Sequence, residues 1–399
     1  MTHSHDPTPT LCDEPWNDPA HREAVPCPLC EAPPDDAIVV GTRARFGMAV
    51  RNVACHRCGL VHVSPRPTPA AMDAYYRGPY RAQYRNVKLP APGGGFVGPD
   101  DAGYHAARVH RYRQQAAIAA TLGGTPPGGR VLEVGCRDGQ TLANLRDEHG
   151  LRVFGVEPGP AEAQTARERG VEVFVGLLEE YAPDGEGFDQ VQMFHVLEHL
   201  HDPLGALSRL ASWLKPDGRL IIEVPNVTHP YGPLEGNFFQ NAHLFSFSAN
   251  TLRGLFVRAG LRVERLVDGN TLFVVGTPEA VAEAPRPFGP DTVPHPEQDG
   301  AWIATRLDTY RHLERLRAEI RGGAANMDRL GAVTQLLRRP GFATHTTETV
   351  RDLVDFFARV GAPRAAMAVA TAAAAGPHPV ELISFCHRVV AECRARLGQ

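Results

Sequence analysis

The sequence contains no uninterrupted apolar run of the roughly 18 residues that a membrane-spanning helix needs, which argues against a membrane partner. Its first residues lack a basic stretch followed by an apolar core, so we expect no secretory signal and a cytoplasmic location. A basic excess is missing too: 41 Lys and Arg stand against 45 Asp and Glu, a net charge of −4. Because nucleic-acid binders depend on clustered positive charge, this balance argues against a nucleic-acid partner.

Residues that interrupt regular structure are abundant instead. The chain has 39 glycines and 35 prolines in 399 residues, and its length predicts two or three domains separated by long connections. A hydrophobic fraction of 43% with 22% charged residues excludes a disordered or fibrous chain.

Four of the eight cysteines form two pairs of the type Cys-x-x-Cys. These pairs, Cys27 with Cys30 and Cys55 with Cys58, are 24 residues apart, and we expect a hairpin over 38–53 between them. Two such pairs on tight turns place four thiolates at the corners of a tetrahedron, which predicts a structural zinc. With four sulfur ligands the ion has no open position and would not catalyse. Redox pairs or disulfides are the alternative, and a reducing compartment disfavours disulfides.

Six segments follow from composition and periodicity. They are a flexible tail over 1–20, a small zinc-ribbon-like domain over 21–67, a helical lid or linker over 68–125, an α/β domain over 126–276, a Pro-rich linker over 277–299 and an all-helical C-terminal domain over 300–399.

The α/β domain alternates short apolar runs with amphipathic helices. Asp202 and Ser248 are expected to cap two of these helices at their N-termini. The alternation predicts a parallel sheet covered on both faces, with its ligand at the carboxyl ends of the strands. The expected strands are 131–134, 153–156, 171–175, 191–194, 219–224, 263–267 and 272–275.

A glycine-containing loop follows the first of these strands. Gly135 and Gly139 let the backbone turn sharply and approach a ligand, and Glu133 stands near the end of the strand. Glu157 ends the next strand, where a carboxylate can accept both hydroxyls of a ribose. Because no Gly-Lys-Ser/Thr follows, the loop fits an adenosine-containing cofactor better than a triphosphate.

On these residues the sequence resembles the class I S-adenosylmethionine (SAM)-dependent methyltransferases over about 130–276. Arg137 replaces the middle glycine of the family's first motif, and the Gly-Cys-x-Asp-Gly form is similar to that of sugar C-methyltransferases. The resemblance implies a seven-stranded Rossmann-like sheet and SAM as cofactor; a dinucleotide-dependent dehydrogenase is the competing interpretation. The cofactor-binding residues it implies are Glu133, Gly135, Cys136, Gly139, Glu157, Leu177, Leu178 and His195.

A dense polar cluster follows the strand 191–194. His195-x-x-Glu198-His199 matches an inverted zinc-protease pattern, but that motif requires a continuous helix and this one crosses a strand end. The form VLEH-x-x-DP is instead similar to small-molecule methyltransferases. For His195 and His201, a role in merely capping the loop stays open.

A third segment, from Asn237 to Leu261, contains a further histidine. By the resemblance to zinc-containing sugar methyltransferases, His243 is a candidate proton acceptor, His199 is the second candidate, and Tyr80 is the tyrosine of a substrate lid. Gln240 and Ala242 replace the tyrosine and glutamate that accompany this histidine in the family. Since abstracting a proton from carbon needs that fuller assembly, the sequence favours methylation of a hydroxyl, with NDP-sugar C-methylation as the alternative.

Three classes of function remain. The leading one is an enzyme that methylates a small-molecule or saccharide acceptor. The others are a zinc-containing RNA methyltransferase, which would need a basic groove with aromatic platforms, and a non-catalytic SAM-binding protein. The C-terminal helices could close over the substrate, form a homodimer or dock a partner, and their pattern fits all three.

Overall fold

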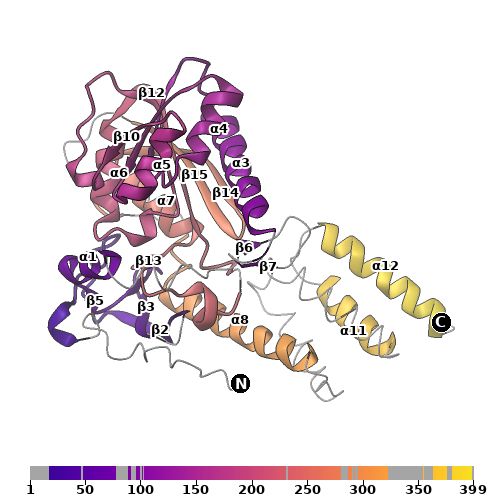
Figure 1. Cartoon of the computed structure of the whole chain (residues 1–399). Coiled ribbons are helices and arrows are strands. Elements are labelled where there is room, and N and C mark those ends of the chain that lie inside the picture. Colours follow the sequence, from indigo (N-terminus) through magenta and orange to yellow (C-terminus); the bar gives the residue numbers. More distant parts are fainter. Residues whose placement is uncertain are drawn as a thin grey trace, which may run out of the picture. The chain divides into compact units, whose positions relative to one another are not determined.

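The computed structural model describes residues 18–45, 48–77, 89–90, 96–98, 101, 103–230, 232–279, 286–289, 292, 295–321, 354, 363–374 and 380–397 (Figure 1). The chain divides into two compact units. The first contains Met1–Val227 and Glu235–Gly300, and the second contains Thr228–Leu234 and Ala301–Gln399. The expected tail lies almost entirely outside the described residues.

A seven-stranded sheet forms the centre of the first unit, and all seven expected strands are present. Five neighbouring strands of the sheet run parallel, and β15 (Thr271–Pro278) is antiparallel to both of its neighbours. The expectation of a wholly parallel sheet is therefore wrong at one edge, because a short turn at Gly269 and Asn270 makes the last two strands a hairpin. The order is β10 (Glu172–Val175), β9 (Arg152–Glu157), β8 (Arg130–Val134), β11 (Phe188–Phe194), β12 (Leu214–Pro225), β15 (Thr271–Pro278) and β14 (Leu261–Asp268).

Helices cover both faces of this sheet, as the strand–helix alternation predicts (Figure 1). On β8, Val131 packs into the core on one face and Leu132 into the core on the other, since successive side chains of a strand alternate. The helices of the first face are α3 (Tyr104–Gly123), α4 (Gln140–His149) and α5 (Pro160–Glu168), and those of the second are α6 (Pro203–Ser212) and α7 (Ala249–Arg258).

The four-cysteine segment forms a second, smaller sheet. Its strands, in the order β13, β4, β3 and β2, include the expected hairpin between the two cysteine pairs, and β13 comes from the segment that follows His243. Leu29 and Leu60 share one hydrophobic core with Phe245, Leu132 and Leu207, so this sheet and the α/β layers are packed together. The strands are β2 (Ala37–Arg43), β3 (Ala49–Cys55), β4 (Val61–Val63) and β13 (Phe245–Ser246).

Shorter elements complete the first unit. They are η3 (Pro19–His21), β1 (Arg22–Glu23), β5 (Arg66–Pro67), α1 (Pro69–Arg77), β6 (Leu89–Pro90), β7 (Phe96–Val97), η5 (Leu178–Glu180) and η6 (Leu197–His199), with η7 (Leu234–Phe238) crossing from one unit to the other.

The C-terminal region is helical where it is described, as expected. Its helices are α8 (Gly300–Arg321), α11 (Pro363–Ala374) and α12 (Val380–Leu397), and α11 packs against α12. Among the described helices, none combines the length and the apolar character that crossing a bilayer requires.

Candidate active site

The loop between β8 and α4 adopts three left-handed backbone conformations in five residues. Gly135 has φ +76° and Gly139 has φ +70°, and a Cβ added to either would lie within 3 Å of a neighbouring side chain. Arg137, which replaces the family's middle glycine, also takes positive φ, at +52°. The substitution therefore keeps the turn, at the steric cost that a side chain carries in this conformation.

Glu157, at the end of β9, holds this loop from the neighbouring strand. Its Oε2 accepts a hydrogen bond from the Arg137 amide at 3.0 Å, and its Oε1 accepts one from the Gly159 amide at 2.7 Å. Burial raises the pKa of Glu157, although these two amides favour the charged form. The carboxylate predicted to bind a ribose thus lies directly against the loop predicted to bind the rest of the cofactor.

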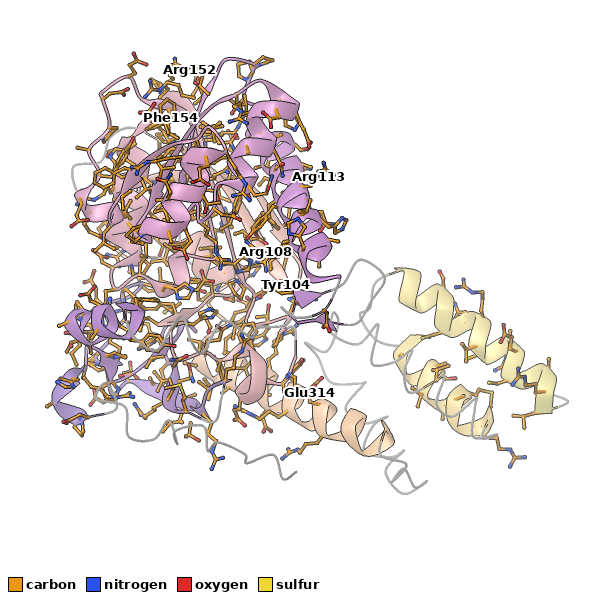
Figure 2. The ribbon with its side chains drawn as sticks, in the orientation of Figure 1. Tyr104, Arg108, Arg113, Arg152, Phe154 and Glu314 are labelled. Carbon is orange, nitrogen blue, oxygen red and sulfur yellow. The ribbon has the colours of Figure 1, made fainter. Side chains whose placement is uncertain are left out.

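Asp138 ties the same loop to the helices around it. It forms an ion pair with Arg108 of α3 at 3.0 Å, and Figure 2 labels Arg108 on that helix. A second guanidinium, that of Arg169, lies 3.5 Å from the same carboxylate.

Glu133 is completely buried beneath the loop. Burial raises its pKa to about 8, against the effect of the amide of Gln192, which donates a hydrogen bond to its Oε2 at 2.6 Å. At neutral pH this carboxyl is therefore largely protonated. Burial likewise raises the pKa of the Cys136 thiol, so that it stays protonated and unreactive.

Leu177 and Leu178, which the resemblance implies near the adenine of the cofactor, follow β10. Leu177 is 51% exposed, and Phe174 and Val175 beside it are also partly exposed. Leu178 is buried in the core. Exposed apolar side chains at a strand end are suited to cover a flat aromatic ring.

His195 follows β11 directly and lies between two carboxylates. Its Nε2 is 3.2 Å from Glu223 and its Nδ1 is 3.6 Å from Glu198, while Gln115 donates a hydrogen bond to Glu223 at 2.7 Å. Burial alone would lower the pKa of His195, but the two carboxylates outweigh it and raise the pKa to about 9. His195 is therefore an imidazolium at neutral pH. Its backbone has a left-handed conformation, with φ +54°.

His199 and His243 pack edge to face, with ring centroids 4.7 Å apart. The Nδ1 of His199 lies 2.9 Å from the carbonyl oxygen of Ala242. A carbonyl only accepts, so Nδ1 carries the proton and Nε2 is unprotonated. The hydroxyl of Tyr76 lies 3.0 Å from the same Nδ1. Burial lowers the pKa of both histidines, that of His243 well below its ordinary value, which makes them a neutral pair at pH 7.

The smaller sheet positions His243. Two residues after this histidine, β13 pairs with β4, placing Phe245 opposite His62. The Val63 amide donates to the Leu244 carbonyl at 2.9 Å, and the Arg45 amide donates to the Phe239 carbonyl at 2.7 Å. The backbone on both sides of His243 is thus fixed by the four-cysteine segment.

The four cysteine side chains converge as a tetrahedral metal site requires. Cys27 and Cys58 have their sulfur atoms 3.6 Å apart, those of Cys30 and Cys55 are 3.4 Å apart, and all four thiols are buried. Zn–S bonds of about 2.3 Å imply sulfur–sulfur edges of about 3.8 Å, so the residues fit a zinc ion.

The structure also brings in residues that the motifs did not single out. Tyr76 contacts His199, and the predicted Tyr80 lies outside the described residues. Glu198 and Glu223 supply the charges around His195. Tyr76 belongs to the run of tyrosines after residue 74 and Glu198 to the VLEH motif, but only the tertiary contacts distinguish them from their neighbours. His201 contacts the Pro67 carbonyl at 3.1 Å and so has a structural partner.

The protease-like pattern is not a helix. β11 ends at Phe194, a single turn covers Leu197–His199, and α6 begins at Pro203 after the N-cap Asp202. The interruption expected from the sequence is therefore present.

Comparisons with known proteins identify the class of part of the chain. Residues 105–266 match a family model described as a methyltransferase domain, so the chain contains such a domain. The expected resemblance is confirmed at that level.

Two curated relatives extend the comparison. The C-methyltransferase NovU of Streptomyces niveus is 28% identical over 282 residues, which are 67% of this chain and 61% of that protein. A ubiquinone biosynthesis O-methyltransferase of Xanthomonas campestris pv. campestris is 35% identical over 109 residues, 26% of this chain and 45% of that protein. The chain thus spans about three fifths of the length of NovU and less than half of the length of the ubiquinone biosynthesis O-methyltransferase. The crystal structure of Streptomyces venezuelae DesVI superposes with a TM-score of 0.34 at 22% identity, covering 44% of this chain and 95% of that one.

Proposed function

We propose that this chain transfers a methyl group from SAM to a hydroxyl oxygen of a small-molecule or saccharide acceptor, and that His243 takes the hydroxyl proton. The observation that carries the proposal is the neutral pair of His199, in the turn after β11, and His243, two residues before β13. A Cβ on Gly135 would meet the side chain of Val196, three residues before His199, and the charge of Arg137 acts on His199, so the glycine loop lies against the segment that carries this histidine.

The donor needs no activation by the protein, because the sulfonium is already a good leaving group. The chain's residues then have two tasks. They align the acceptor oxygen with the methyl group, which can supply up to about 7–11 kcal/mol, and they provide a base, which typically adds 10²–10⁴ in rate. A buried imidazole kept neutral at pH 7 suits the second task.

The His243→Ala variant tests the base. We expect its kcat to fall about 10²–10⁴-fold while the Kd for SAM, measured by calorimetric titration, stays within about twofold. His295→Ala removes an exposed histidine and serves as the control. A loss of activity below about tenfold in His243→Ala would exclude the base role, and a wild-type chain that binds no SAM would exclude the function itself.

We also propose that a structural zinc occupies the four-cysteine site. Cys27, Cys30, Cys55 and Cys58 would hold it, and their buried thiols leave no position for water or substrate.

Carbon methylation is the second candidate. It is favoured by the similarity to NovU, whose name states C-methyltransferase activity. The buried Gln240 and Ala242 beside His243 favour oxygen, since neither can act as an acid or base. Incubation with labelled SAM and a panel of sugars and nucleotide-sugars, followed by mass spectrometry and NMR of the product, identifies the methylated atom.

A further inference from the structure

The carboxylate of Glu198 is buried between two histidines. It is 1% exposed, and neither oxygen receives a hydrogen bond from the described part of the chain. Its Oε1 lies 3.6 Å from His195 Nδ1 and 3.9 Å from His243 Nε2. Burying a carboxylate without hydrogen bonds costs folding free energy. The presence of Glu198 at this position therefore points to a role toward the imidazoles beside it.

His195 lies between two carboxylates, those of Glu223 and Glu198, and the positive charge of Arg111 also acts on Glu223. Glu223 makes the shorter contact, and Gln115 also bonds it. The carboxylate of Glu198 also faces the imidazoles on its other side: its charge favours the charged form of His199, and its Oε1 faces His243 Nε2.

His243 is neutral, and a neutral imidazole exists as two tautomers. A carboxylate next to Nε2 favours the tautomer that carries the proton on Nε2. The other nitrogen, Nδ1, is then unprotonated and can accept a proton. At 3.9 Å the contact is too long for a hydrogen bond, but such bonds in unliganded enzymes often tighten when substrate binds.

We infer that Glu198 is a positioning residue that selects the Nε2–H tautomer of His243 and stabilises the imidazolium formed when His243 accepts the acceptor's proton. The inference rests on the proposed function. In the step concerned, the acceptor oxygen forms its bond to the methyl carbon as the sulfur–methyl bond breaks and the hydroxyl proton passes to His243 Nδ1. Sulfur leaves with the electron pair as a neutral thioether. Because the imidazolium exists only as the reaction proceeds, the attraction to Glu198 acts on the transition state and not on bound substrate.

Glu198 supplies a carboxylate that the residue before His243 cannot supply. Ala242 precedes His243 and has no acidic group, while Glu198 approaches from a different segment, the turn after β11. The carboxylate that acts on the base thus comes from the strand end instead of from the base's own segment.

A double-mutant cycle tests whether Glu198 acts through His243. We expect Glu198→Gln to lower kcat about 10²–10³-fold with the Kd for SAM unchanged, whereas in the His243→Ala background the same change should alter kcat less than about threefold. Glu264→Gln, a carboxylate on β14 that pairs with Arg219 away from the site, is the matched control and should keep wild-type activity. Equal losses in both backgrounds would overturn the inference, because a purely structural effect is independent of His243.

The tautomer of His243 gives a test that needs no turnover. In the ¹⁵N-labelled protein, with His243→Asn used to assign the signal, we expect the Nε2–H form in wild type and a shift toward the Nδ1–H form in Glu198→Gln. The Nδ1–H form in wild type, or the same tautomer in both proteins, would overturn the inference even if the proposed function held. Conversely, a wild-type chain without methyltransferase activity would defeat the proposed function and leave this measurement decisive.

The metal content of wild type and of Glu198→Gln tests a rival account of the same cluster. The candidate ligand atoms of Glu198, His199 and His243 lie within 4.8 Å of one another, so a cation there is the rival account of the same cluster. One zinc per chain, unchanged in Glu198→Gln, supports positioning. A second ion that is lost in Glu198→Gln would overturn it.

Discussion

At the scale of single residues, burial and neighbouring charge set the protonation of the site in opposite directions. His195 is held charged by two carboxylates, His199 and His243 are held neutral, and Glu133 is held protonated. The motifs alone place His195, His199 and His243 within 49 residues and say nothing of which of them is charged. Only the distances to Glu198 and Glu223 separate a fixed cation from a candidate base.

This division predicts how stability depends on pH. The pKa of His195 is about 9 in the folded chain against an ordinary value of 6.5, so the folded state binds more protons between these values. Its ion pairs therefore contribute fully below about pH 6.5, by up to about 3 kcal/mol, and the contribution is lost as the pH rises through 9.

Thermal unfolding of wild type and His195→Gln between pH 5.5 and 10 measures the effect. The difference in Tm should be largest at low pH and should shrink toward pH 9.5. A difference that is constant across this range would show that His195 is not charged in the folded protein.

At the scale of elements, local sequence signals were sufficient for most of the secondary structure. Asp202 was expected to cap a helix, and its Oδ1 accepts a hydrogen bond from the Gly205 amide at 2.8 Å at the start of α6. Ser248 does the same for α7 together with Thr251. Caps and strand periodicity depend on neighbours in the chain, which explains why the sequence predicts them. The positive φ of Arg137 depends on Glu157 and on the loop's path, and was not predictable.

Removing the cap of α6 tests the strength of this local signal. We expect Asp202→Ala to destabilise the first unit by about 1 kcal/mol, because an amide at the helix start loses its acceptor. Urea unfolding followed by circular dichroism gives the value. Asp202→Ser keeps an acceptor and should lose less than half as much; equal losses in the two variants would mean that the carboxylate's charge, and not its capping bond, stabilises the helix.

At the scale of the whole molecule, the four-cysteine sheet and the α/β layers are parts of one packed unit. β13 follows His243 and completes the smaller sheet by pairing with β4, while Arg258 of α7 forms an ion pair with Glu31 beside the cysteines at 2.7 Å. The segment that holds the candidate base is thus fixed by the smaller sheet, to which the four-cysteine segment belongs.

Loss of the metal should therefore impair catalysis more than cofactor binding. We expect Cys58→Ser to lower the zinc content below one per chain and to reduce kcat at least tenfold, since the backbone around His243 loses its pairing partner, while the Kd for SAM changes only a few-fold. Plasma mass spectrometry and calorimetry measure the two quantities. Cys393→Ser, in the second unit, is the control and should change neither. Full activity in a zinc-free Cys58→Ser variant would show that the smaller sheet holds His243 without the metal.

The sequence by itself determined the elements that rest on short-range pattern: seven strands, two capped helices and a glycine loop after the first strand. It also predicted that the two cysteine pairs lie close together, as they do. The tertiary structure decided which polar groups meet. Tyr76 contacts His199, and β4 pairs with the strand after His243, although these partners are more than 100 residues apart in the chain. Glu198 lies between His195 and His243, and the motif does not show in which direction its side chain points. Hydrogen bonds and charges act over a few ångströms in space, and no spacing along the chain records which distant groups come that close.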